Sequence, residues 1–237
     1  MPTVVVMADP PGDVLPALHE TLGPADAVTL YEAMLGDICA AVQNGAGELL
    51  VNYQDDEDAK PRLRAALDDE VPRPGDVRYE VQVGQTFAGR VGNTVTHLLE
   101  SEGVDSVAVV EPTAAFVSRE TLGTLTMKLR TRDAVVGPST GGRVFLAGFR
   151  APIDFEGAFD RPALTTLVER AREADLEVDF TPTLPVIATP RDLVTAVTQI
   201  RARVDAGRNV PPRTAGFVAD HNLRVVDDDG ELRVVAG

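Results

Sequence analysis

Four segments rich in polar residues and glycine follow predicted strands, and they hold the side chains best suited to bind a ligand. Glycine lets a backbone come close to a phosphate, free N–H groups at a helix start bind it, and arginine neutralises its charge. The candidate nucleotide- or phosphate-binding residues are Ala8, Asp9, Gly12, Gln82, Gly84, Gly89, Arg90, Asn93, Glu111, Thr113, Ser139, Thr140, Gly141, Gly142 and Arg143. Because each segment alone is typical of an ordinary turn, the prediction depends on their meeting at one place.

The sequence lacks the motifs that assign a reaction by themselves. It contains no G-x-x-x-x-G-K-S/T phosphate loop, no G-x-S-x-G nucleophile elbow and no cluster of Cys and His residues. His19, His97 and His221 are widely separated, and His97 lies in an amphipathic helix where a boundary position is expected. Cys39 lies beside the apolar stripe of its helix, which indicates a buried small side chain rather than a nucleophile. No catalytic residue is therefore predicted.

Strand and helix patterns alternate along most of the chain and indicate how the four segments are positioned. Strands are predicted over residues 3–8, 48–53, 77–83, 106–110, 133–136, 144–149 and 176–181, with helices over 24–43, 56–69, 86–101, 118–129, 160–174 and 189–204. The run 106–110 is the most continuously apolar and predicts a central strand that is buried on both faces. This alternation predicts a three-layer α/β/α domain with a mainly parallel sheet, in which the polar segments gather at the carboxyl edge.

The last thirty residues differ from this pattern. Residues 217–226 and 232–235 look like strands around the turn Asp227-Asp228-Asp229-Gly230, which predicts a β-hairpin. The acidic turn lacks the remaining ligands of a calcium loop, so a solvated turn is expected. We therefore predict an α/β domain over residues 1–207 and a hairpin appendage over 208–237. The appendage could pair with a sheet edge, with a second copy of the chain or with another protein.

Composition limits the environment and the partners. The chain has 237 residues, of which 44% are hydrophobic, and its 37 acidic residues outnumber 22 basic ones to give a net charge of -15. Only Lys60 and Lys128 are lysines. An acid excess with little lysine is typical of a protein in a high-salt cytoplasm, where salt screens self-repulsion; the alternative is an ordinary acidic protein from a GC-rich genome.

The same features argue against several classes of protein. The negative charge disfavours nucleic-acid binding, and no apolar run approaches the ~20 residues that span a membrane. The N-terminus lacks a basic leader and is predicted to form the first strand, so no signal peptide is expected. A single cysteine excludes an internal disulfide. We expect a cytoplasmic protein with no membrane span and no nucleic-acid partner.

Several landmarks, in the same order, resemble the glycosyltransferase-like DUF2064 family. The segment 137–149, read Gly-Pro-Ser-Thr-Gly-Gly-Arg-Val-Phe-Leu-Ala-Gly-Phe, is similar to the family's G-P-A-x-D-G-G-Y-Y-L-x-G-L, and Asp154-Phe155-Glu156-Gly157 follows it. Other matches are Leu22-Gly23-Pro24, Gln82-Val83-Gly84 with Gly89-Arg90, and Thr189-Pro190-Arg191-Asp192-Leu193. The resemblance covers roughly residues 3–205 and implies a divergent, haloarchaeal-type member with a GT-A-like fold. That fold is shared by nucleotide-diphospho-sugar transferases and related nucleotidyltransferases.

The departures from the family pattern fall where a metal and phosphates would bind. Asp9 stands in place of an early lysine, Leu15-Pro16-Ala17 replaces Lys-Thr-Arg, and Thr113 stands where an aspartate is expected. Gly141, Val186 and Ala188 replace three further acids. Enzymes of this fold use such acids to hold Mg²⁺ or Mn²⁺ beside the leaving phosphates. No metal site is therefore expected unless Asp9 and Glu111 rebuild one.

Two functions remain open on this basis. One is a non-catalytic descendant that has lost the metal-binding acids and keeps a nucleotide or anion pocket. The other is an active transferase on a nucleotide or nucleotide sugar, with a rebuilt or metal-independent site in which Arg90 and Arg143 supply the positive charge. A Rossmann-type oxidoreductase is disfavoured, because the first loop has no G-x-G-x-x-G.

Overall fold

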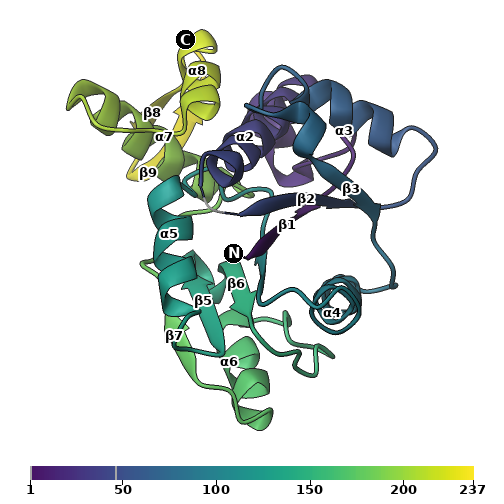
Figure 1. The fold of residues 1–237 in the computed structure, drawn as a ribbon. Helices are drawn as coiled ribbons and strands as arrows, with labels where there is room; N and C mark the ends of the chain where they lie inside the picture. The colour runs from purple at the N-terminus through teal and green to yellow at the C-terminus, as the bar shows by residue number, and fades with distance from the viewer. Residues whose placement is uncertain (1, 46) are drawn as a thin grey trace.

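The computed structural model describes residues 2–45 and 47–237 and contains a seven-stranded sheet at its centre (Figure 1). The strands are β1 (Thr3–Ala8), β2 (Glu48–Tyr53), β3 (Arg78–Val81), β4 (Val107–Val110), β5 (Ala134–Pro138), β6 (Val144–Phe149) and β7 (Val178–Phe180). Their order is β3-β2-β1-β4-β6-β5-β7, and β6 is antiparallel to its neighbours β4 and β5. The run 106–110 does form the central strand, and β4 is buried along its whole length.

Helices cover both faces of the sheet and complete the three layers that the sequence predicts. They are α1 (His19–Leu22), α2 (Pro24–Asn44), α3 (Ala59–Leu67), α4 (Phe87–Thr96), α5 (Arg119–Lys128), α6 (Ala163–Glu173), α7 (Pro190–Asp205) and α8 (Pro212–Asp220). One buried cluster joins the sheet to α2, α3, α5, α7 and α8, and a second joins its other face to α4 and α6. The three-layer α/β/α prediction is therefore confirmed.

The C-terminal tail contains a helix that the sequence prediction missed. Residues 217–220, predicted as strand, belong to α8, and the hairpin that follows consists of β8 (Arg224–Asp228) and β9 (Glu231–Val235). Thr214, Phe217 and Val218 are the buried residues of α8, and this three-and-four spacing is that of a helix face. Packing of that face against α2 outweighs the β-like local pattern. The hairpin itself is confirmed, while the boundary near residue 208 stays a prediction.

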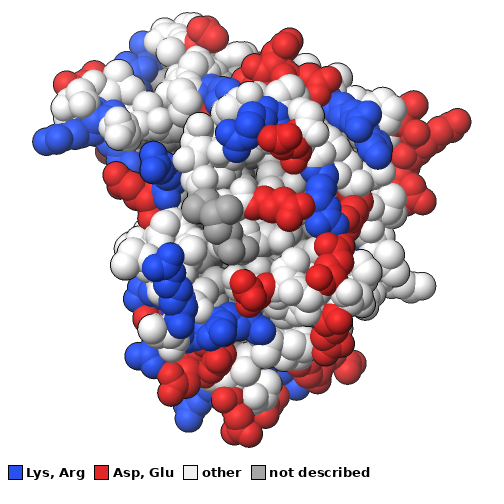
Figure 2. Space-filling model, viewed as in Figure 1, with Lys and Arg blue, Asp and Glu red and all other residues white. Residues whose placement is uncertain are grey.

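Charged side chains of both signs lie on the face shown in Figure 2. Acidic residues are spread over the upper, central and lower parts of this face, with arginine and lysine side chains between them.

The part of the chain that the structure describes has no helix long and apolar enough to cross a membrane. The expectation of a high-salt cytoplasm remains a prediction from composition.

A buried carboxylate holds the tail on the main body. Asp37 of α2 accepts hydrogen bonds from the Arg213 and Thr214 N–H groups at 3.0 and 2.8 Å, and from the Thr214 hydroxyl at 2.8 Å. The Arg213 guanidinium lies 3.5 Å from the same carboxylate, and its Nε donates to Glu70. Asp37 thereby supplies acceptors for the N–H groups at the start of α8.

Replacing this carboxylate should loosen the tail. We expect Asp37→Ala to lower the free energy of unfolding by about 3 kcal/mol, because it leaves the buried N–H and hydroxyl donors at the start of α8 without an acceptor and removes one of the two carboxylates near Arg213. Urea unfolding measures the loss, and limited proteolysis should cut first within residues 208–222. Asp26→Ala is the matched control on α2: its carboxylate lies 3.5 Å from His221 and is 45% exposed, so a change below about 1 kcal/mol is expected. Equal effects of the two substitutions would contradict the assigned role of Asp37.

Candidate functional site

A cavity of about 390 Å³ opens at the carboxyl ends of β1 and β4. From β1 the chain continues outward to β2 and β3, whereas β4 begins the other half of the sheet. Such a change of direction leaves a crevice between the two strands, which is where α/β sheets bind ligands. Met7 and Asp9 line the cavity from the end of β1, and Val109 and Glu111 from the end of β4.

Residues from all four predicted segments reach this cavity, although many of the candidates do not. The lining residues among them are Asp9, Gln82, Arg90, Glu111, Thr113 and Arg143. Gly89 and Asn93 instead line a neighbouring cavity of about 630 Å³, and the two cavities share Phe87 and Phe159. Ala8, Gly12, Gly84, Ser139, Thr140, Gly141 and Gly142 line neither cavity.

The glycine-rich segments serve mainly local structure. Gly84 has a φ of 135°, and a Cβ there would lie 3.0 Å from the Arg90 nitrogen, so glycine permits the turn into α4. The Thr86 hydroxyl accepts the Gly89 N–H at 3.0 Å and caps α4, which occupies one N–H that a phosphate would otherwise use. Thr140 accepts hydrogen bonds from Arg143 through its carbonyl and its hydroxyl.

Three buried polar atoms on the cavity lining have no hydrogen-bond partner among the described residues. They are Gln82 Oε1, Arg90 Nε and Thr113 Oγ1; a fourth atom of this kind, Ser139 Oγ, lies on a residue outside the lining. Gln82 and Thr113 are only 9% and 7% exposed. The Gln82 amide donates to the carbonyl oxygens of Asn52 at 2.8 Å and Ala8 at 3.5 Å, so its own oxygen remains an acceptor. Unsatisfied buried polar groups are costly, and their concentration at one cavity points to a ligand that completes them.

Two guanidinium groups of the cavity are free to meet an anion. Among the described residues the Arg90 guanidinium donates only to the Gln85 carbonyl, at 3.3 Å, and Arg161 lines the same cavity. Neither forms a salt bridge with any residue in the described ranges 2–45 and 47–237. Guanidinium groups match the geometry of phosphate oxygens and keep their charge at any physiological pH.

Glu111 has an altered acidity. Burial raises its pKa to about 6, against smaller lowering effects of Thr113 and the positive charge of Arg143, while the negative charge of Asp192 raises it further. The Thr113 hydroxyl is near enough to act on this carboxyl, although it makes no hydrogen bond of normal geometry. A carboxyl with such a pKa can hold or accept a proton near neutral pH.

Arg143 is held by Asp192, the last acid of the late motif. The Arg143 Nη1 and Nη2 atoms donate to the two Asp192 oxygens at 2.8 and 2.5 Å. Asp192 also accepts the Thr189 hydroxyl at 2.8 Å and closes the capping box of α7. Burial would raise the pKa of Asp192, but the bonds from Arg143 and Thr189 outweigh it and lower the pKa. Arg143 is thus paired, unlike Arg90 and Arg161.

Solved structures share this architecture. A proposed nucleotide-diphospho-sugar transferase from Desulfovibrio desulfuricans G20 aligns over 94% of this chain and 96% of its own, with a TM-score of 0.77 and 22% identity. A cytidylyltransferase from Leptospira borgpetersenii aligns over 93% of this chain and 94% of its own, with a TM-score of 0.53 and 10% identity. A 4-diphosphocytidyl-2C-methyl-D-erythritol synthase from Anaerococcus prevotii aligns over 84% of this chain and 95% of its own, with a TM-score of 0.54 and 14% identity. The chain has the nucleotide-diphospho-sugar transferase fold.

No protein-family model and no curated protein sequence matches the chain. The solved structures confirm the fold that the resemblance predicted. Membership of the DUF2064 family stays a prediction, because no family model matches. Because the similarities lie below 25% identity, they do not transfer a substrate or a reaction to this chain.

The side chains present do not make a ready site for the divalent ion that the nucleotide-diphospho-sugar transferase fold implies. The described residues contain no group of three or more His, Cys, Asp or Glu side chains that could hold a metal ion. Asp9 accepts a hydrogen bond from Gln54, Glu111 is partly buried near the positive charge of Arg143, and Asp192 is paired with Arg143. Hard cations need several oxygen ligands with net negative charge, and here a guanidinium already neutralises one carboxylate. We derive no step through a metal.

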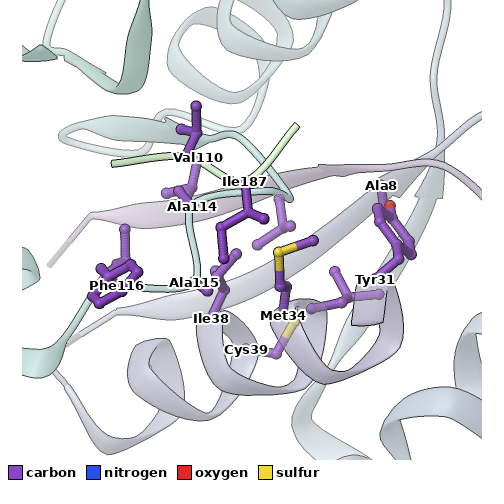
Figure 3. Close-up of a cluster of buried hydrophobic side chains, with 14 of the residues drawn as sticks. Ala8, Tyr31, Met34, Ile38, Cys39, Val110, Ala114, Ala115, Phe116 and Ile187 are labelled. Atoms are coloured by element: carbon purple, nitrogen blue, oxygen red, sulfur yellow. The ribbon is translucent and has the colours of Figure 1, made fainter. Parts of the chain in front are cut away.

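The late motif also departs from the family at buried positions. Val186 and Ile187 are fully buried, and the Ile187 N–H donates to the Thr113 carbonyl at 3.0 Å. Figure 3 shows Ile187 among the buried side chains near Val110 and Ala114. Val186 is therefore a core residue in this chain, and an acid at that position would be desolvated.

Sequence reasoning missed several residues of the site. Asp192 was named only within the Thr189–Leu193 segment that carries the resemblance, and its pairing with Arg143 was not predicted. Arg161 and Gln54 line the cavity from segments without a recognised motif. The Tyr31 hydroxyl, buried in α2, accepts the Asp9 N–H at 2.8 Å and fixes the first loop. The helix over 24–43 was predicted, but its periodicity carries no signal of this contact.

The altered pKa of Glu111 yields a stability prediction. Its folded-state pKa of about 6 exceeds the ordinary glutamate value of 4.5, so the folded chain loses stability as pH rises through this interval and the carboxyl ionises. We expect Glu111→Gln to be more stable than the wild type by about 2 kcal/mol near pH 7, with the difference shrinking toward pH 5. Urea unfolding across this range measures it, and the exposed Glu120→Gln is the control. A difference that is absent or that grows on acidification would contradict the assigned environment.

Proposed function

We propose that this chain binds a nucleotide or nucleotide sugar in the cavity between β1 and β4, and that it has lost the metal-binding acids of related transferases. The observation that carries the proposal is the set of unpartnered buried atoms on Gln82, Arg90 and Thr113, which all belong to the lining of one cavity. The cavity volume of about 390 Å³ lies within the roughly 300–1,000 Å³ typical of small-molecule sites.

The distribution of groups in the cavity suits a ligand with an anionic part and an apolar or aromatic part. Arg90 and Arg161 would neutralise a diphosphate, because neither is paired with a carboxylate among the described residues. Val14, Leu15 and Phe145 contribute apolar walls for a base or sugar ring. The Gln82 oxygen accepts hydrogen bonds only, so the ligand should offer an N–H or O–H donor there.

An active transferase is the second candidate, and Glu111 favours it. Its raised pKa, at the carboxyl end of the central strand, would let it take a proton from an attacking hydroxyl group. The binding function ranks first because the acids that would gather a divalent ion beside leaving phosphates are replaced by Thr113, Gly141, Val186 and Ala188. Partners beyond the nucleotide, including one at the C-terminal hairpin, stay predictions.

Nucleotide titration tests the proposal. Isothermal titration calorimetry in molar KCl should be run with GTP, CTP, UTP, UDP-glucose and GDP-mannose, each with and without Mg²⁺ or Mn²⁺. We expect one of these ligands to bind, and Arg90→Gln to weaken that binding by about 10- to 100-fold, because the variant loses a charge-assisted contact to phosphate. Arg208→Gln, which alters an exposed arginine beyond the end of α7, is the matched control.

The outcomes separate the two functions. Binding without conversion of the ligand supports the first candidate, and product formation that Glu111→Gln abolishes supports the second. If none of the five ligands binds, or if Arg90→Gln and Arg208→Gln have equal effects on binding, a nucleotide site at this cavity is rejected.

A further inference from the structure

Arg143 lies among the acidic groups that a metal ion would need. Its bidentate pair with Asp192 leaves that carboxylate 8% exposed, and its charge also lowers the pKa of Glu111. The Glu111 N–H donates to the Phe145 carbonyl at 3.0 Å, two residues from Arg143, and Glu111 and Arg143 line the same cavity, so the three groups share one neighbourhood. Glu111 follows the end of β4 and Asp192 lies in the first turn of α7, and the segment after β4 is joined to the segment before α7 by the Ile187–Thr113 hydrogen bond of 3.0 Å.

We propose that the Arg143 guanidinium is the resident cation of this site and stands between Glu111 and Asp192 where a divalent ion would otherwise bind. The proposal rests on the proposed function for the kind of ligand that the site takes, an anionic nucleotide. Its central claim concerns only the three side chains and can be tested without a nucleotide.

The local structure holds Arg143 in this role. The Nε atom donates to the Thr140 carbonyl at 3.0 Å and Nη2 to the Thr140 hydroxyl at 3.1 Å, in addition to the two bonds to Asp192. Four of its five N–H groups are thereby used, and the fifth, on Nη1, remains for a ligand in the cavity that Arg143 lines. A guanidinium stays protonated, so the site keeps this positive charge without drawing an ion from solution.

The glycine loop is built to bring Arg143 to that place. Gly141 and Gly142 both have positive φ, of 70° and 73°, and the loop turns back so that the Ser139 N–H donates to the Arg143 carbonyl at 2.8 Å. The position where the family pattern has an acid, Gly141, thus serves a turn that directs a cation toward the remaining acids.

Removing the arginine should therefore create a metal site. Mn²⁺ alone is titrated into the full chain and followed by the electron paramagnetic resonance of free Mn²⁺, with thermal unfolding as the second readout. We expect Arg143→Met and Arg143→Gln to bind Mn²⁺ at least about tenfold more tightly than the wild type, because two carboxylates lose their internal cation. Arg143→Gln is included because its amide N–H can still donate to Asp192, so this variant is expected to stay folded if Arg143→Met does not. Arg143→Lys, which retains a cation, should behave like the wild type.

A further substitution locates the gained site. Adding Glu111→Gln to either neutral variant should return Mn²⁺ affinity to the wild-type value. The proposal is overturned if the neutral variants fold and gain no affinity, or if the wild type already binds Mn²⁺ through Glu111. It is also overturned if neither neutral variant folds even with Mn²⁺ present, because a bound ion should replace the lost charge. Failure of the wild type to bind any nucleotide would reject the proposed function but would leave this result standing.

Discussion

Burial of β1 and β4 on both faces is the constraint on which the rest of the structure depends. All six residues of β1 and all four of β4 are buried, so helices must cover both sides of the sheet and polar groups are confined to its edges. The chain leaves β1 in one direction and β4 in the other, which opens the cavity at their carboxyl ends. Tyr31 shows how the core and the site are connected, because its buried ring packs in α2 while its hydroxyl holds the Asp9 backbone.

The charge of Asp192 in this crevice is neutralised by an ion pair with Arg143 rather than by solvent. Asp192 and Arg143 neutralise each other in a partly buried position, and such a pair is expensive to break because each partner alone would be a buried charge. Glu111 has no such partner at bonding distance, and its pKa rises accordingly. Arg90 and Arg161 remain unpaired within the described part of the chain and leave the cavity with positive charge, in a protein whose net charge is -15.

The sequence predicted the layers of the fold better than the details of the site. Apolar runs and helical spacing were sufficient for the central strand, the covering helices and the hairpin, because burial dictates those patterns. The helix α8 was missed because its buried face, with Phe217 and Val218, depends on α2 from the other end of the chain. The loops at the carboxyl edge were predicted, but which side chains enter the cavity was not. That outcome depends on long-range pairs such as Arg143–Asp192, 49 positions apart, for which local spacing carries no information.

A resident guanidinium and a bound metal ion differ in what they let a site do. A divalent ion brings two charges, contacts several phosphate oxygens at once and can leave with the product, whereas Arg143 brings one charge that Asp192 already balances. Only one Arg143 N–H has no acceptor among the described residues, so little new stabilisation is available when charge develops on a leaving phosphate. Catalysis needs contacts that stabilise the transition state more than the bound ligand, whereas binding needs only contacts to the bound ligand itself. Arg90 and Arg161 can supply contacts of the second kind. This difference is the physical reason for ranking a nucleotide-binding role above turnover, and it follows from the pairing of Arg143 with Asp192.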